Sequence, residues 1–179
     1  TAANDWLPID YGFVTLNIDK AWFASNNVRL PTQLSQLAEP TYAKLLVVQN
    51  PATSSPGLAF LSATVQSQGA GVWGWWKNLR ANGVKVSNSW SDAYYKDFTR
   101  NGGTRPMVVS YLSSPAAEVF YSDKPLTESP TANLNLTGGM YAQIEGIALV
   151  DGGATTAVTQ QAALDFMRFM RGAEAQAAL

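Results

Sequence analysis

A cluster of hydroxyl side chains separates a short apolar run from a helical pattern. The apolar run at 44–49 is typical of a strand buried on both faces. It is followed by four residues suited to a tight, hydrogen-bonding turn: Thr53, Ser54, Ser55 and Gly57. Free N–H groups at a helix start bind anions, and hydroxyl groups add further donors, but serine and threonine are also ordinary helix caps. The segment therefore indicates a seat for a phosphate or carboxylate, with a plain helix cap as the alternative.

Two further strand-to-helix turns carry aromatic and polar side chains. Trp90 follows a short strand expected at 84–87, and Asp92 lies two residues further on. Tyr111 ends another expected strand, and Ser113 opens the turn after it. Because ligands of open α/β sheets bind at the carboxyl ends of the strands, we expect these turns to share one binding edge. An aromatic ring there would stack on a flat or cationic group, although core packing would also account for Trp90.

Residue types that the sequence lacks exclude several reaction classes. Without any Cys or His, the chain has no thiolate nucleophile, no Ser-His-Asp triad and no Cys- or His-ligated zinc. Ser54 lacks the glycine-flanked elbow of a serine hydrolase, and no phosphate-loop or dinucleotide-binding glycine motif occurs. We therefore expect no enzymatic activity, no cofactor and no metal site. A small phosphoester hydrolase that uses carboxylates such as Asp92 and Glu145 is an alternative.

The composition fits one ordinary globular domain. The chain has 179 residues, of which 46% are hydrophobic and 14% are charged, and a domain averages roughly 150 residues. Lys+Arg 12 and Asp+Glu 13 leave a formal net charge of -1, whereas nucleic-acid binding requires a basic face. We therefore expect no nucleic-acid partner. The longest apolar runs are also far shorter than the ~20 residues of a membrane span.

Strand and helix patterns alternate along the chain. Strands are expected at 11–18, 44–49, 84–87, 106–111 and 140–150, and helices at 31–38, 58–68, 72–81, 90–100, from 113 onward and from 155 onward. The polar stretch 122–133 is expected to be a loop. Such alternation predicts an α/β fold of three layers, with a largely parallel sheet flanked by helices.

The ordered set of these segments resembles the extracytoplasmic solute-binding proteins of ABC importers. Residues 47–57 (VVQNPATSSPG) resemble a strand-to-helix segment of that family. Residues 88–94 (NSWSDAY) and 109–116 (VSYLSSPA) look like its thiamine-binding branch in particular, and residues 141–145 and 166–170 also fit that branch.

The resemblance implies a type II periplasmic-binding-protein fold, in which two lobes close on a ligand like a hinged clamp. Residues 1–179 would then form a single α/β lobe, the second of the two. Residues 10–18 and 139–150 would be crossover strands between the lobes. The helix expected at 155–179 would pack on the first lobe.

The resemblance also implies a ligand and a setting. The ligand would be thiamine, thiamine phosphate or thiamine pyrophosphate, with its phosphate at Ser54 and its aromatic cation lined by Trp90 and Tyr111. The family often has a further Tyr where this chain has Ala117, which leaves a related phosphorylated or heteroaromatic cation open. The full-length protein would deliver its ligand to an ABC permease, and it would lie in the periplasm or be tethered to the cell surface.

A related branch that binds ferric iron with a synergistic anion is an alternative. That branch typically uses adjacent tyrosines, and Tyr94-Tyr95 is the adjacent pair in this sequence. The pair falls in an expected helix, where neighbouring side chains point in different directions.

Two expectations follow from a lobe that stands alone. A single lobe offers only one wall of the binding cleft. It should therefore bind its ligand with a mid-micromolar to millimolar dissociation constant, which corresponds to a binding free energy of about -4 to -6 kcal/mol. Apolar surface near Phe166, Phe169 and the 11–18 strand should be uncovered, and such a patch favours self-association into homodimers.

Overall fold

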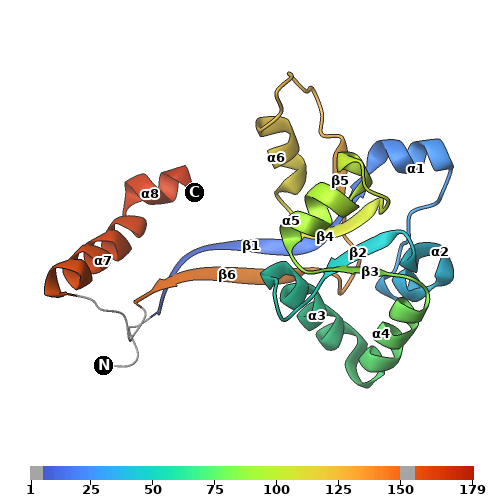
Figure 1. Cartoon of the computed structure of the whole chain (residues 1–179), viewed down its shortest axis with the longest axis horizontal. Helices are drawn as coiled ribbons and strands as arrows, with labels where there is room; N and C mark the ends of the chain where they lie inside the picture. The colour runs from blue at the N-terminus through green and yellow to red at the C-terminus, as the bar shows by residue number, and fades with distance from the viewer. Residues whose placement is uncertain (1–5, 150–155) are drawn as a thin grey trace. The chain divides into compact units, whose positions relative to one another are not determined.

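The computed structural model describes residues 6–149 and 156–179, which fall into two compact units (Figure 1). The larger unit comprises residues 12–142, and the smaller unit combines the chain up to residue 11 with residues 143–179. Within the described ranges, no helix has both the length and the apolar character needed to cross a membrane.

The larger unit is built on a mixed sheet. The strands are β1 (Trp6–Asp19), β2 (Leu46–Gln49), β3 (Lys85–Ser87), β4 (Met107–Tyr111), β5 (Thr131–Leu134) and β6 (Tyr141–Ala148). They are ordered β3-β2-β4-β1-β5, and β6 pairs with β1 outside this path. β2 is parallel to β3 and β4, whereas β1 is antiparallel to β4 and β5. The α/β class is therefore confirmed, and β3, β2, β4 and β5 run in one direction with β1 opposed between β4 and β5.

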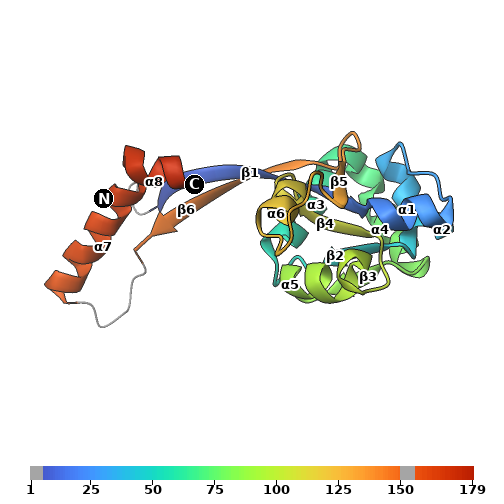
Figure 2. The same ribbon diagram turned by 90° about the horizontal axis from the view of Figure 1, so that it is seen from above.

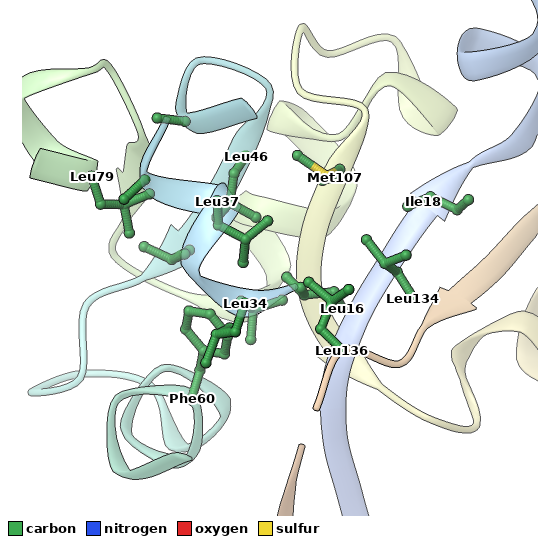
Figure 3. Packing of buried hydrophobic residues seen from close by; sticks show 14 of the residues in the cluster. Leu16, Ile18, Leu34, Leu37, Leu46, Phe60, Leu79, Met107, Leu134 and Leu136 are labelled. Carbon is green, nitrogen blue, oxygen red and sulfur yellow. The ribbon is translucent and has the colours of Figure 1, made fainter. Parts of the chain in front are cut away.

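One face of this sheet carries a large apolar core (Figure 3). Residues of β1, β2 and β4 that alternate along each strand point into it, among them Leu16, Leu46 and Met107. Phe60 and Leu79 cover them from two helices of the same face. Burial of such side chains contributes roughly 1.5–3 kcal/mol each, so this face contributes strongly to the stability of the fold.

The opposite face combines a smaller apolar cluster with buried polar side chains. Val47 and Val108 pack there against Tyr94 and Phe98, with Trp90 at the margin. The polar part comes from β1 and β4, whose buried members include Thr15, Asn17 and Ser110.

Helices flank the sheet on both faces (Figure 2). In the larger unit they are α1 (Lys20–Asn26), α2 (Pro40–Ala43), α3 (Ser55–Gln68), α4 (Val72–Ala81), α5 (Trp90–Asp92) and α6 (Ser114–Phe120), whereas α7 (Ala157–Met170) and α8 (Ala173–Ala178) belong to the smaller unit. The helix expected at 72–81 is confirmed. α3 begins three residues earlier than expected because Ser54 caps it and Pro56 is tolerated in its first turn.

Three expected elements were wrong in detail. In place of a helix at 31–38, a 3₁₀ helix covers Leu34–Ala38, since the side chains of Gln33 and Gln36 form a capping box there. The helix expected at 90–100 continues beyond α5 as a π-helix over Ala93–Asp97 and then breaks at Phe98, whose backbone is extended. The stretch 122–133 is not wholly a loop, because β5 begins within it and pairs with β1.

The smaller unit contains β6 from Gln143 onward, the first residues of β1, and two helices where one had been expected. α7 starts after the cap residue Thr156 and ends at Met170, and the extended backbone of Gly172 separates it from α8. Gln176 of α8 donates a hydrogen bond to the carbonyl oxygen of Ile9 at 2.9 Å. Phe166 and Phe169 are exposed, as expected for the apolar surface of this helix. The expected strand end at 150 and helix start at 155 lie outside the described residues.

Candidate ligand-binding edge

The start of α3 sits directly on the end of β2. Ser54 is the N-cap of the helix, and its Oγ accepts a hydrogen bond from the backbone N–H of Gly57 at 3.5 Å. A Cβ atom at Gly57 would lie 2.6 Å from the carbonyl oxygen of Gln49. Only glycine therefore lets the first turn of α3 approach the strand so closely, and this approach places the helix N–H groups at the carboxyl edge of the sheet.

A hydrogen bond donated by a hydroxyl group connects the turn after β2 to the turn after β3. Thr53 Oγ1 donates to the carbonyl oxygen of Asn88 at 2.6 Å, and the Asn50 N–H donates to Ser87 O at 2.8 Å. Thr53 and Ser55 are both exposed. The hydroxyl proton of Thr53 is thus engaged within the protein, whereas the Ser54 oxygen accepts its bond and keeps its own proton to donate.

A chain of hydrogen bonds through serine hydroxyl groups connects the turns after β3 and β4. Trp90 Nε1 donates to Ser110 Oγ at 2.8 Å, and Ser110 Oγ lies 2.8 Å from Ser114 Oγ. Ser114 Oγ also accepts from the backbone N–H of Tyr111 at 3.2 Å. The chain fixes the indole of Trp90 over the end of β4, beside the start of α6.

Trp90 lies in a cluster of aromatic rings. Its ring stacks on Tyr94 with centroids 5.1 Å apart and planes 23° apart. Tyr95 meets it edge-on at 5.4 Å, and Tyr111 lies 6.0 Å away at a tilt of 54°. One face of the indole is therefore covered by Tyr94, and a ligand that stacks on Trp90 would do so on the other face.

Two of the predicted site residues have other surroundings than expected. Asp92 forms an ion pair with Lys96 at 2.5 Å and accepts a bond from Ser89 Oγ at 2.9 Å. These bonds, that to Lys96 first, lower the pKa of the Asp92 carboxyl below its ordinary value. Ser113 is exposed, and its side chain makes no capping bond to α6.

Sequence reasoning included Ser114 in the turn that Ser113 opens but missed Ser110, and the structure brings both serines together with Trp90. The spacing of four residues between the two serines, on either side of the strand end, was the available signal. Pro115 was a second signal, because proline favours the first turn of a helix and so marks Ser114 as its start.

A cavity of about 610 Å³ lies between the π-helix that follows α5 and α6. Trp90 and Ser114 line it, together with Arg100, Glu118 and Tyr121. The predicted anion seat at Ser54 is not part of its lining. The cavity therefore extends away from the strand ends rather than containing them.

The wall of this cavity is held by a buried tyrosine. Tyr94 OH donates to Glu118 Oε1 at 2.7 Å, and Arg100 Nε lies 3.2 Å from Glu118 Oε2. Burial, followed by the bond to Glu118, raises the pKa of Tyr94. Ferric iron is bound by deprotonated tyrosine, so this environment does not favour the iron alternative at Tyr94-Tyr95. Within the described ranges, no cluster of three or more Asp, Glu, His or Cys residues could hold a metal ion.

The carboxylates named for the hydrolase alternative belong to different units. Asp92 lies in the larger unit and Glu145 in the smaller one. Glu145 is exposed on β6 and accepts a bond from Gln143 Nε2 at 2.8 Å. Neither unit by itself therefore contains this carboxylate pair.

The sequence profile of a family described as bacterial extracellular solute-binding protein matches residues 2–179. The chain belongs to this family. It is 30% identical over 167 residues to the thiamine-binding periplasmic protein of Brucella abortus biovar 1, which covers 93% of this chain and 46% of that protein. The thiamine-binding periplasmic protein of Escherichia coli is 31% identical over 168 residues, covering 92% of this chain and 46% of that protein.

Solved structures agree with this assignment. A periplasmic thiamin-binding protein superimposes with a TM-score of 0.75 at 28% identity, covering 94% of this chain and 48% of that one. A second periplasmic binding protein shares the fold with a TM-score of 0.76 at 16% identity, over 97% of this chain and 51% of that one. The type II periplasmic-binding-protein fold is thus confirmed, and the chain spans about half the length of the curated relatives it matches.

Proposed function

We propose that this chain is a ligand-binding lobe of an ABC importer's solute-binding protein for thiamine or its phosphate esters. It holds the ligand and does no chemistry on it. The observation that carries the proposal is the meeting of Trp90, Tyr111 and several hydroxyl groups where β2, β3 and β4 end. The names of the relatives supply the ligand class.

The phosphate end of the ligand would bind at the start of α3. The 14-residue helix points the positive end of its dipole there, and the backbone N–H of Ser55 would donate, since Pro56 has no N–H and the Gly57 N–H is bonded to Ser54 Oγ. Ser54 and Ser55 add hydroxyl donors, whereas the Thr53 proton already serves Asn88. Gly57 supports this seat by packing, because it brings the first helical turn onto β2.

The aromatic cation would bind against the exposed faces of Trp90 and Tyr111, whose rings lie 6.0 Å apart. A cation over an aromatic face gains about 0.5–2 kcal/mol, depending on how far it is desolvated. Tyr94 covers one face of Trp90 and so orients the other toward a ligand. Asp92 stands two residues further on and would contribute through its negative charge, while Ser113 would contribute an exposed hydroxyl at the start of α6.

The setting of this lobe forms part of the proposal. We place it outside the cytoplasm, in the periplasm or tethered to the cell surface, with an ABC permease as the partner of the full-length protein. The lobe by itself would bind thiamine compounds with a mid-micromolar to millimolar dissociation constant. The exposed Phe166 and Phe169 would promote homodimers at high concentration.

The proposal is tested by titrating the chain with thiamine pyrophosphate, thiamine and pyrophosphate while tryptophan fluorescence is followed. We expect saturable quenching by both thiamine compounds that is lost in Trp90→Ala. Trp73→Ala is the matched control, because Trp73 is an exposed tryptophan of the same unit on α4. Ser54→Ala should weaken pyrophosphate and thiamine pyrophosphate but not thiamine. Quenching that persists in Trp90→Ala, or a nanomolar affinity for the chain alone, would contradict the proposal.

A further inference from the structure

We infer that Glu118 on α6 is a positioning residue, which sets the orientation of the Trp90 indole through Tyr94. The inference rests on the proposed function, because Trp90 serves there as the stacking surface of the ligand. Glu118 belongs neither to the anion seat at the start of α3 nor to the pair of rings that would bind the aromatic cation. It would change ligand affinity through the tyrosine ring that lies behind Trp90.

The indole of Trp90 is held at its edge and at one face. Its Nε1 donates to Ser110 Oγ at 2.8 Å, which fixes the edge but still allows the ring to turn about that bond. Tyr94 lies nearly parallel to the indole, with planes 23° and centroids 5.1 Å apart, whereas Tyr95 and Tyr111 are inclined by 82° and 54°. The tilt of the face that a ligand would meet therefore depends on the position of Tyr94.

The ring of Tyr94 is in turn fixed by Glu118. Tyr94 is 4% exposed, and its hydroxyl donates to Glu118 Oε1 at 2.7 Å. A hydrogen bond to a carboxylate is roughly twice as strong as one between neutral groups, and a buried hydroxyl without a partner is costly. Without the carboxylate, the phenol would have to turn toward another acceptor, and its ring would no longer lie flat against Trp90.

An ion pair holds the Glu118 carboxylate in place. Arg100 Nε, from the 3₁₀ turn Thr99–Asn101, lies 3.2 Å from Glu118 Oε2. The arginine and glutamate side chains are 36% and 14% exposed, and a partly buried pair of this kind is screened less than one on the surface. Each carboxylate oxygen thus has a partner, which defines the direction of Oε1 toward Tyr94.

Two routes to Trp90 begin on one face of α6. Ser114 and Glu118 are four residues apart in this helix, and side chains at that spacing lie on the same face. Ser114 Oγ lies 2.8 Å from Ser110 Oγ, which accepts the indole N–H, while Glu118 reaches the face of the indole through Tyr94. α6 therefore positions both the edge and the face of the ring. Such pre-organisation raises affinity, because less ordering is needed on binding.

The test follows thiamine affinity by calorimetry and the indole ¹⁵N–¹H resonance of Trp90 by NMR, both on the full chain. Glu118→Ala should weaken thiamine about 2- to 10-fold, move the Trp90 resonance before any ligand is added, and leave pyrophosphate affinity unchanged. Glu118→Gln keeps an acceptor for the Tyr94 hydroxyl and should recover most of the affinity. Glu128→Ala is the matched control, because it removes an exposed glutamate of the same unit together with its ion pair, and it should change neither quantity.

A double-mutant cycle separates this role from a general effect on stability. Tyr94→Phe removes the hydroxyl but keeps the ring, and it should weaken thiamine to a similar extent as Glu118→Ala. The two losses should not add in the double variant, because both changes remove the same hydrogen bond. A purely stabilising role of Glu118 would lower the free energy of unfolding without moving the Trp90 resonance or changing thiamine affinity.

The inference would be overturned by a Glu118→Ala variant with unchanged thiamine affinity and an unmoved Trp90 resonance, or by losses that add fully in the double variant. If Glu118→Ala fails to fold, Tyr94→Phe decides, since it removes one oxygen atom. Failure of the proposed function looks different: thiamine would not bind the unmodified chain at all. The Trp90 resonance of the ligand-free variants would even then show whether Glu118 positions the indole.

Discussion

The two faces of the central sheet differ although both are buried. Along β1, Leu16 and Ile18 enter the apolar core on one face, while Thr15 and Asn17 are just as inaccessible on the other. The apolar residues need only a complementary surface. The polar ones depend on hydrogen-bond partners, because an unmade hydrogen bond inside a protein costs about 1–3 kcal/mol; Thr15 and the Asn17 amide nitrogen have such partners, whereas Asn17 Oδ1 has none.

The comparison teaches where specificity can be built. Asn17 Nδ2 donates to Tyr111 O at 3.2 Å and to Asn133 Oδ1 at 3.1 Å, and so joins β1 to both of its neighbours. Ser110, on β4, holds Trp90. The polar face therefore positions side chains through directional bonds, while the apolar face supplies non-directional stability.

The largest effect is expected on the apolar face. Leu16→Ala removes a fully buried side chain and should lower the free energy of unfolding by about 2–5 kcal/mol. Chemical denaturation measures this loss, and the thiamine affinity of the remaining folded protein should not change. Leu30→Ala, at an exposed leucine, is the control. A loss of thiamine binding free energy larger than the loss of unfolding free energy would show that the apolar face also positions the ligand site.

A smaller loss is expected from the polar face. Asn17→Ala removes the buried amide that donates to Tyr111 O and Asn133 Oδ1, so we expect a loss of about 1–3 kcal/mol in unfolding free energy. Asn26→Ala, which removes an exposed amide bonded to Trp22 O, should cost less than about 0.5 kcal/mol. Equal losses for the two variants would show that burial of the amide does not matter.

Replacing Ser110 is expected to lower the free energy of unfolding only modestly but to weaken thiamine binding more clearly. Ser110→Ala removes the acceptor of Trp90 Nε1, which should cost about 1 kcal/mol of stability. Because the indole is then free to turn, thiamine affinity should fall about 2- to 10-fold. Isothermal calorimetry measures the affinity, with the exposed Ser91→Ala as control. Unchanged affinity would mean that the ring cluster alone orients Trp90.

The smallest effect is expected from the exposed ion pair between Asp92 and Lys96. The pKa of Asp92 is lowered, chiefly by its bond to Lys96, so the pair stabilises the fold above the ordinary value of 3.8 and loses this effect as the pH falls further. Unfolding free energies of the unmodified chain and Lys96→Met should therefore differ at pH 7 and converge at strongly acidic pH. A difference that grows on acidification would have the wrong sign.

Much of this arrangement could be predicted from the sequence because it follows from local patterns. The alternation at 11–18, the apolar run at 44–49 and the helical pattern at 72–81 each specify one element. Because ligands bind at the carboxyl ends of the strands of open α/β sheets, Ser54, Trp90 and Tyr111 were then expected on one edge of the sheet. β5 was missed because four residues in a polar stretch acquire strand geometry only by pairing with β1.

The cavity could not be predicted for a related reason. It depends on the π-helix after α5, in which the N–H of Phe98 bonds to Ala93 O, and on the bond between Tyr94 and Glu118, 24 positions apart. Such long-range bonds leave no periodic signal. The hydroxyl bridge from Ser110 to Ser114 has a spacing that can be read, but its partner Trp90 cannot be deduced from that spacing.

The central claim is that a thiamine compound binds at the Trp90 edge of the polar face. Nitrogen-15 NMR of the indole N–H groups tests it most directly, because the six tryptophans report from separate places in one titration with thiamine pyrophosphate. We predict a saturable shift of the Trp90 resonance, whose N–H bonds to Ser110, and no shift of Trp73 on α4. A Trp90 resonance that stays in place, or a Trp73 shift as large as that of Trp90, would contradict the account.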